Sequence, residues 1–346
     1  MTKGSAKSLA RLYDRFVGIL DKLPGGLQKP LLKELQPIRD LFLDRRVAHI
    51  GLVGGSIASV PELFAAMGVR PVRAGELLQG WRDYTSLEGN IISILDARAS
   101  ALESPLEIGL SHRIPDLFLI VQDAEPLPED WKESMRRATV GGTLVLGLCS
   151  NPDYRQRLED LLSYEPLVAT SAPVVLEPGN PATAESLCAA LPLQAQIEFA
   201  QFTKARRAQA YIASRLLRSF SAMCAIIALQ PIPFADLPFL LSLQSLMIGL
   251  IIYTTGRNVG LKLIAEFLTS LGLGAAAGLA FREAARIAVR IVPFWGNAVS
   301  GVVAGAGTYA IGRAAIAYFI DDALLAETRR LFTGPWCNST TRAMSP

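Results

Sequence analysis

The chain contains a glycine-rich segment at a position where proteins commonly bind phosphate. The apolar run His49–Val53 leads directly into Gly54 and Gly55, and Ser59 follows shortly afterwards. Where a buried strand runs into a helix, the backbone N–H groups of such a segment favour anions. The pattern predicts either a degenerate nucleotide site or an ordinary strand-to-helix turn that requires glycine.

The side chains that normally hold a triphosphate are missing from this segment. A phosphate loop has the form Gly-x4-Gly-Lys-Ser/Thr, and only the leading Gly54 fits it. Ser59 occupies the position of the second glycine, Val60 that of the lysine and Pro61 that of the magnesium-binding hydroxyl. Valine carries no charge, and proline has neither a hydroxyl nor an N–H group. We therefore expect no catalytic residue and no cofactor, with weak binding of a nucleotide as the alternative.

Two aspartates follow later apolar runs, at the expected ends of strands. Asp96 comes directly after Ile91–Leu95, and Asp153 follows Thr143–Leu148. If these runs are parallel strands, their carboxyl ends lie at the same edge of the sheet as Gly54. Aspartates at strand ends commonly cap turns, and position alone indicates this role for Asp96 and Asp153.

Cysteine, histidine and charge argue against several other functions. The four cysteines are scattered without a Cys-x-x-Cys pair, and the only histidines are His49 and His112. We therefore expect no metal site and no Ser-His-Asp centre built on a Gly-x-Ser-x-Gly turn. The formal net charge of +3 lacks the large basic excess typical of nucleic-acid-binding proteins, so we expect no nucleic-acid partner.

The middle of the chain must position these residues, and its pattern predicts an α/β domain over residues 48–200. Short apolar runs alternate with polar segments that are long enough for crossover helices. Strands that are buried on both faces by helices have this appearance, so we predict a mainly parallel sheet with flanking helices. The predicted strands are His49–Val53, Ile91–Leu95, Leu117–Val121, Thr143–Leu148 and Pro173–Leu176.

The two ends of the chain have a different composition from the middle. Residues 1–47 hold ten Lys/Arg and five Asp/Glu, and their apolar spacing predicts a helical lead-in with one helix ending at Pro24 and another following Pro30. No signal peptide is visible. Residues 201–333 predict a hydrophobic, all-α domain, and residues 334–346 a tail without regular structure.

The hydrophobic helical domain contains apolar segments of near-membrane length. A bilayer core requires about 20 helical residues. Phe220–Leu229 is too short to span, Phe239–Tyr253 is borderline, and Ala298–Ile320 contains Arg313, which is costly inside a bilayer. A proline-broken hairpin that enters one leaflet and a buried helical hairpin both fit these segments.

The order of motifs in residues 48–200 resembles an Era-like (translation-factor-class) GTPase domain. The helix Pro61–Gly68 resembles the family's Ser-Ser-Leu-x-Asn-Ala-Leu-x-Gly helix. The family's Asp-x-x-Gly falls on Asp96–Ala99 with the glycine lost, and its guanine-reading Asn-Lys-x-Asp falls on Ser150–Asp153 with only the aspartate kept. The resemblance implies a P-loop-GTPase-like fold with a degenerate nucleotide site.

The hydrophobic helical domain resembles the bacterial domain of unknown function 697, which often follows an Era-like GTPase domain. The residues that carry the resemblance are Pro231–Pro238 with Gln244 and Met247, then Ile291–Gly296, then Ala304–Gly312. The resemblance implies membrane association and no reaction, because that family has no settled activity.

These observations lead to one expected function and two alternatives. We expect a pseudo-GTPase-like protein that acts by binding partners or lipid without turnover, at the cytoplasmic face of the inner membrane. The alternatives are a divergent GTPase that binds nucleotide weakly through Asp96 and Asp153, and a soluble helical scaffold. The sequence identifies no protein partner and leaves oligomerisation open.

Overall fold

The computed structural model divides the chain into two compact units. One comprises Asp40–Tyr211, and the other joins Thr2–Arg39 with Ile212–Pro346. The predicted domain boundaries at residues 47 and 200 stay predictions. The structure describes residues 13–14, 17–18, 25–42, 44–54, 60–67, 69, 73–76, 81–96, 113–122, 143–149, 151–163, 172–175, 181–229, 236–271 and 296–324.

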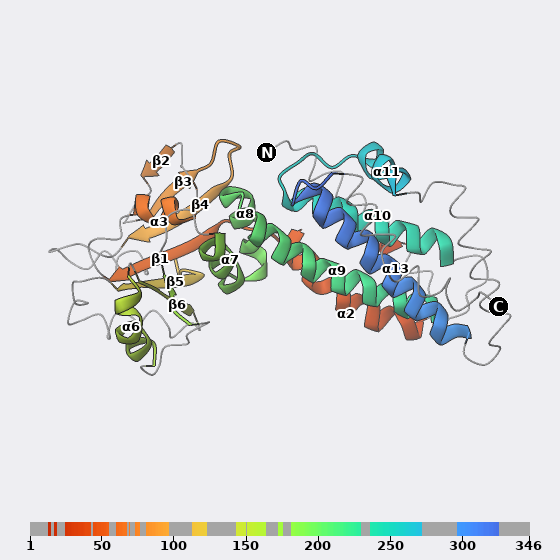
Figure 1. The fold of residues 1–346 in the computed structure, drawn as a ribbon, viewed down its shortest axis with the longest axis horizontal. Coiled ribbons are helices and arrows are strands. Elements are labelled where there is room, and N and C mark those ends of the chain that lie inside the picture. Colours follow the sequence, from red (N-terminus) through yellow and green to blue (C-terminus); the bar gives the residue numbers. More distant parts are fainter. Residues whose placement is uncertain are drawn as a thin grey trace. The chain divides into compact units, whose positions relative to one another are not determined.

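The first unit is built on a seven-stranded, mainly parallel sheet (Figure 1). The strand order is β2-β3-β4-β1-β5-β6-β7, and only the β2–β3 and β3–β4 pairs are antiparallel. The α/β fold with a mainly parallel sheet is therefore confirmed, and every predicted run contains a strand. The strands are β1 (Ala48–Gly54), β2 (Arg73–Glu76), β3 (Trp81–Thr85), β4 (Ile91–Asp96), β5 (Leu117–Gln122), β6 (Leu144–Cys149) and β7 (Val174–Val175).

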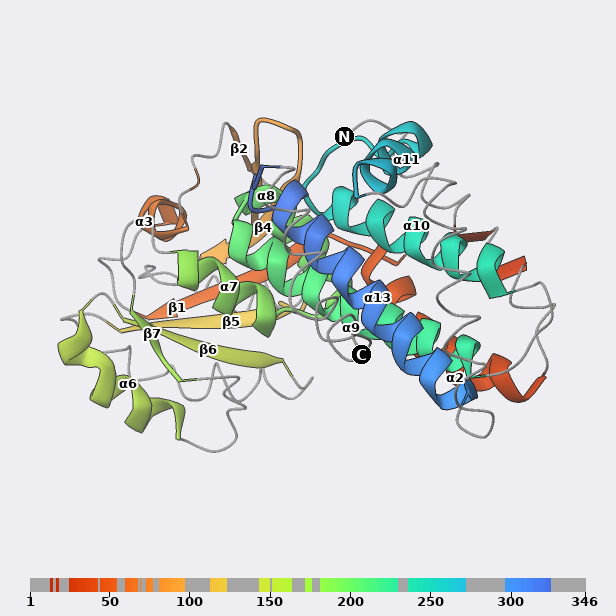
Figure 2. The ribbon, with the colours of Figure 1, turned by 45° about the vertical axis from the view of Figure 1, so that its right-hand side comes forward.

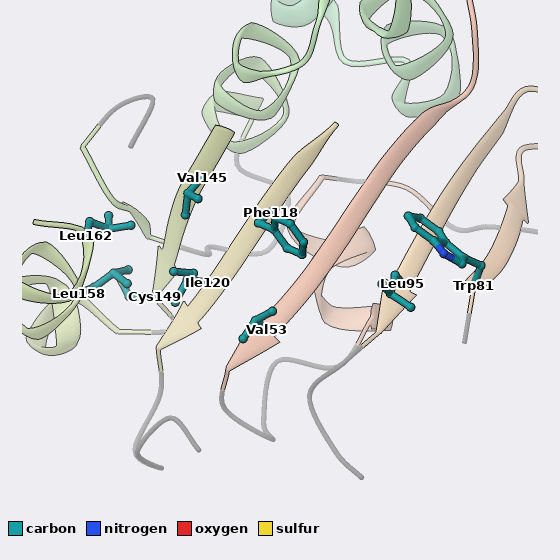
Figure 3. Close-up of a cluster of buried hydrophobic side chains, with 9 residues drawn as sticks. All are labelled: Val53, Trp81, Leu95, Phe118, Ile120, Val145, Cys149, Leu158 and Leu162. Atoms are coloured by element: carbon teal, nitrogen blue, oxygen red, sulfur yellow. The ribbon is translucent and has the colours of Figure 1, made fainter. Parts of the chain in front are cut away.

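The sheet is the core of this unit and is buried on both faces. All six residues of β5 are buried, which explains why the strand reads as a continuous apolar run. Figure 3 shows the buried cluster on one face, where Leu158 and Leu162 pack against the strand side chains. The helical elements are α3 (Val60–Ala66), the 3-10 turn η2 (Pro152–Tyr154), α6 (Arg155–Leu162), α7 (Pro181–Ala190) and α8 (Leu193–Thr203).

One glycine permits a close contact within this cluster. A Cβ atom at Gly51 would lie 2.5 Å from Cε1 of Phe118 on the adjacent strand β5. Because Phe118 is fully buried, it has little room to move away. The glycine in β1 therefore allows an aromatic ring to cover the centre of the sheet.

Most of the helical C-terminal part belongs to the second unit, which begins at Ile212. The apolar segment Phe220–Leu229, which is too short to span a bilayer alone, continues a longer helix, α9 (Arg206–Ala228). The start predicted at Pro30 is wrong, because α2 spans Gly25–Phe42. The other helices are α10 (Asp236–Thr254), α11 (Leu261–Ser270) and α13 (Gly296–Phe319).

Helices α9 and α13 lie side by side, as Figures 1 and 2 both show. Glycines make the contact close: a Cβ atom at Gly305 would lie 3.2 Å from Cβ of Ala225 and 3.3 Å from the carbonyl oxygen of Ser221. Helix α10 also packs on α13, and Gln244 Nε2 donates a 3.2 Å hydrogen bond to Thr308 Oγ1 between them. Small residues thus hold this three-helix bundle together.

Candidate functional site

Three predicted site residues lie at the carboxyl-end edge of the sheet. Gly54 is the last residue of β1, and Asp96 is the last residue of the neighbouring parallel strand β4, where it pairs with Leu52. Asp153 lies in η2, just beyond the end of β6. The parallel strands bring the ends of β1, β4 and β6 to one edge, as predicted. Gly55 and Ser59 lie outside the described residues.

The turn that carries Asp153 is organised by the side chain of Asn151. Asn151 Oδ1 accepts a 3.1 Å hydrogen bond from the Asp153 backbone N–H, and Asn151 is the N-cap of η2. The side-chain amide of Asn151 therefore stabilises the turn by accepting a backbone hydrogen bond. The Asp153 side chain is exposed, which leaves its carboxylate accessible from solvent.

The helix that follows β1 begins with two residues that cannot hold a triphosphate or its metal. Helix α3 starts at Val60 and Pro61, and a proline in the first turn costs no intrahelical hydrogen bond. The helix is anchored by Phe64, whose ring centroid lies 4.8 Å from that of Tyr84 and 5.8 Å from that of Phe202. The N-terminus of α3 therefore offers neither a lysine nor a hydroxyl group at its first two positions.

A polar cluster that the sequence did not predict lies at the opposite, amino-end edge of the sheet. Asp116 directly precedes β5 and is almost completely buried. Its carboxylate accepts hydrogen bonds from both terminal nitrogens of Arg46, at 2.7 Å for Nη1, and from the His49 backbone N–H at 2.9 Å. The Asp116 N–H in turn donates to the His49 carbonyl oxygen at 2.7 Å. This network joins the starts of β1 and β5.

The imidazole of His49 lies inside this cluster between two guanidinium groups. Its Nε2 is 2.9 Å from Arg113 Nη1, and its Nδ1 is 3.4 Å from Arg46 Nη1 and 3.6 Å from Asp116 Oδ2. Because arginine only donates, Nε2 accepts the hydrogen bond from Arg113. The edge of Trp81 meets the ring at a centroid distance of 5.7 Å. Burial, followed by the Arg113 charge, lowers the pKa of His49 below its ordinary value of 6.5, and Asp116 opposes this only in part.

The same level of the sheet also carries a serine and a second aspartate. His49 pairs with Ser93 of β4, and Ser93 pairs with Asp83 of β3, so Asp, His and Ser side chains lie in one row. In a nucleophilic triad the serine hydroxyl bonds the imidazole. Among the described residues, Ser93 Oγ is buried without a hydrogen-bond partner, and the imidazole Nε2 faces Arg113. The row therefore offers no serine that is activated by the imidazole.

The described residues offer no other candidate centre for metal or thiol chemistry. Among them, no group of three His, Cys, Asp or Glu side chains is placed to hold a metal ion. Cys149, which ends β6 beside the predicted guanine-reading segment, is buried, and its burial raises the pKa of the thiol. A protonated thiol is a poor nucleophile and a poor metal ligand.

A signal for the amino-edge cluster is present in the sequence. His49 opens one predicted strand and Asp116 immediately precedes another, and both strands are expected to be parallel. Polar residues at the amino ends of neighbouring parallel strands meet, just as those at the carboxyl ends do.

Comparison with protein-family models finds no match for this chain, and comparison with curated proteins finds no relative.

Proposed function

We propose that the protein is a pseudo-GTPase: an α/β domain of the Era-like (translation-factor-class) GTPase type that has lost nucleotide turnover, followed by a helical domain that associates with a membrane. It acts by binding a partner or lipid. The resemblance of the second domain to domain of unknown function 697 is part of this proposal, as is its place at the cytoplasmic face of the inner membrane.

The sheet topology supports the nucleotide-domain half of the proposal. Strand β1 lies between β4 on one side and β5 on the other, so the chain order reverses at β1. In open α/β sheets, ligands bind outside the carboxyl ends of the strands at such a reversal. Gly54, Asp96 and Asp153 belong to the edge where a nucleotide would be expected.

The observation that carries the loss of turnover is the start of helix α3. Val60 and Pro61 occupy the positions of the lysine that contacts the β- and γ-phosphates and of the hydroxyl that holds Mg²⁺. Phosphoryl transfer depends on positioning and on electrostatic stabilisation of the transferring group. Without either positive charge, nucleotide binding and hydrolysis both lose their main stabilising contribution.

The membrane half of the proposal rests on helix length and composition together with exposure. Arg206–Ala228 and Gly301–Phe319 are long and apolar enough to cross a bilayer. The core helices of soluble proteins pass the same test, and fewer than half of the residues in each apolar window are buried within the structure. The alternative is a soluble helical scaffold in which these apolar helices form the core, and carbonate extraction distinguishes the two.

Isothermal titration of the full chain with GTP and GDP, with and without Mg²⁺, tests the nucleotide half. We expect no Mg²⁺-dependent binding by the natural chain. The double substitution Val60→Lys and Pro61→Ser restores the two missing groups and is expected to gain some binding if the fold at this edge is as proposed. Micromolar Mg²⁺-dependent binding by the natural chain that is abolished in Asp153→Ala would favour a divergent GTPase.

Alkaline carbonate extraction of a membrane fraction tests the membrane half. We expect a substantial part of the protein to stay with the membrane pellet. Complete release into the supernatant, together with no binding to added lipid vesicles, would support the soluble scaffold and overturn the membrane assignment.

A further inference from the structure

The directions of three helices bring their apolar ends together. Leu229, just past the end of α9, approaches Gly301 near the start of α13, whereas Leu217 approaches Gly312, so the two helices are antiparallel. Gln244 bonds Thr308, and Met247 contacts Gly312, so α10 runs parallel to α13. The end of α9 and the starts of α10 and α13 therefore lie at one end of the bundle. We call residues 219–229, 236–246 and 296–312 the bundle tip.

The bundle tip exposes large apolar side chains. Val302 is 70% exposed, and half of the strongly exposed large hydrophobic side chains in the described part of the chain belong to the tip. At its other end, α13 is buried, with Phe319 only 2% exposed. A bundle surrounded only by water would be expected to hide these side chains. The exposed apolar residues of the tip are Leu229, Leu241, Val302, Val303 and Tyr309.

Two arginines mark the boundary of the bundle tip. Arg218 and Arg313 flank the contact between Leu217 and Gly312, and both are exposed. Neither forms an ion pair in the described part of the chain. Beyond them, the tip segments carry a single charged residue, Asp236, the first residue of α10. A basic boundary above an apolar tip matches the charge of an anionic lipid surface.

The exposed side of α13 from Val302 to Arg313 matches half of a bilayer in length. Val302, Ala306, Tyr309 and Arg313 follow one another at helical spacing on the exposed side of α13. At 1.5 Å per residue, Val302 and Arg313 are about 16 Å apart along the helix axis. The hydrocarbon core is about 30 Å thick, so one leaflet contributes about 15 Å. Tyr309 lies nearer to the arginine level, where an amphipathic ring is favoured.

We propose that the bundle tip inserts into a single leaflet of an anionic bilayer, with Arg218 and Arg313 at the level of the lipid phosphates. This inference rests on the proposed membrane association and replaces spanning by α9 and α13 with insertion of one end of the bundle. The close glycine contacts between α9 and α13 keep the tip a single packed body as it enters the lipid.

Vesicle binding by the full chain tests the proposal. The probes are vesicles of mixed phosphatidylcholine and phosphatidylglycerol, and vesicles of phosphatidylcholine alone. We expect Val302→Asp to lower the partition coefficient at least tenfold on both, as estimated from the cost of a buried carboxylate. Leu261→Asp changes a residue that is 61% exposed on α11, outside the tip, and should change binding less than twofold by the same reasoning.

Charge variants separate the two parts of the proposed surface. Arg218→Gln and Arg313→Gln should each weaken binding to the anionic vesicles about fivefold, the equivalent of about 1 kcal/mol per basic residue near such a surface. Neither should affect binding to phosphatidylcholine alone. Circular dichroism of each variant checks that the helices are retained.

The depth of a fluorescent label in the bilayer distinguishes insertion of the tip from binding at the membrane surface and from contact with a second copy of the chain. A fluorescent label on Val302→Cys, in a chain that carries Cys337→Ser, should be quenched by lipids brominated deep in the acyl chain. Vesicle binding with this label still in water would overturn insertion of the tip but leave membrane association intact. No vesicle binding and full carbonate release would instead overturn the proposed function. Burial of the label by self-association without lipid would assign the tip to a second copy of the chain.

Discussion

Replacing Asp116 with alanine should destabilise the α/β unit far more than removing an ordinary surface charge. The Asp116 side chain is 6% exposed and accepts hydrogen bonds from the Arg46 guanidinium and from the His49 backbone N–H. In the Asp116→Ala variant, this N–H at the start of β1 loses its acceptor. Water can compensate only in part, because the His49 side chain above it is also mostly buried.

The size of this destabilisation follows from the two partners of Asp116, the His49 backbone N–H and the Arg46 guanidinium. A hydrogen bond to a charged group contributes about 1.5–3 kcal/mol, and the buried His49 N–H should cost an amount in this range. The Arg46 side chain is 43% exposed, so water replaces much of its interaction and its loss adds at most about 1 kcal/mol. Together, Asp116→Ala should lower the free energy of unfolding by about 2–4 kcal/mol.

Urea unfolding followed by circular dichroism measures this loss. Since the chain has two compact units, the relevant transition is the one that Phe118→Ala also shifts, because Phe118 is fully buried in the sheet. The matched control is Glu159→Gln, which removes the exposed 3.0 Å ion pair with Arg155 and should cost about 0.3–0.5 kcal/mol. If Asp116→Ala costs no more than this control, the network does not stabilise the sheet and our reasoning is wrong.

Three further predictions concern titration, helix packing and thiol reactivity. The pKa of His49 is lower in the folded chain than in the unfolded chain, so the unfolded chain binds the proton first as the pH falls through 6.5. The free energy of unfolding should therefore decrease as the pH falls through this range. In urea titrations, His49→Gln should flatten this pH dependence. Gly305→Leu should destabilise the bundle by about 1–3 kcal/mol in thermal unfolding, because the backbone of α9 lies against that position. The same change at Gly307, where an added Cβ atom would meet no atom of another described helix within 4 Å, should be neutral or slightly stabilising, and equal effects would contradict the helix contact. Burial raises the pKa of Cys224 to about 11, so mass spectrometry should find it unmodified by N-ethylmaleimide in the native chain and modified in urea; native labelling would show that the bundle opens there.

The strands of the parallel sheet could be predicted because strands that are buried on both faces appear in the sequence as short, nearly continuous apolar runs. Strand β5 is buried along its whole length and is apolar from Leu117 to Val121, with only its last residue, Gln122, polar. Strands β2 and β3 were missed because they form the antiparallel edge, where β3 alternates buried Trp81 and Tyr84 with less buried residues. Such short alternating segments cannot easily be distinguished from loops by pattern alone.

The candidate nucleotide edge was predictable to the level of strand ends, and no further. Gly54, Asp96 and Asp153 lie at the same edge of the sheet because the strands that precede them are parallel, as the order of apolar runs already implied. That Asn151 caps the turn beside Asp153 could not be read from residue types, because Asn and Asp favour the same turns.

The sequence by itself determined the α/β class, the apolar C-terminal helices and the absence of lysine and hydroxyl groups at Val60 and Pro61, because these depend on local composition and order. The tertiary structure decided which distant side chains meet. Asp116 and His49 are 67 residues apart, and only the pairing of β1 with β5 places a carboxylate on that backbone N–H. The tertiary structure also decided which end of α13 is buried. When a helix is apolar on all sides, its sequence does not indicate which of its residues the neighbouring helices cover.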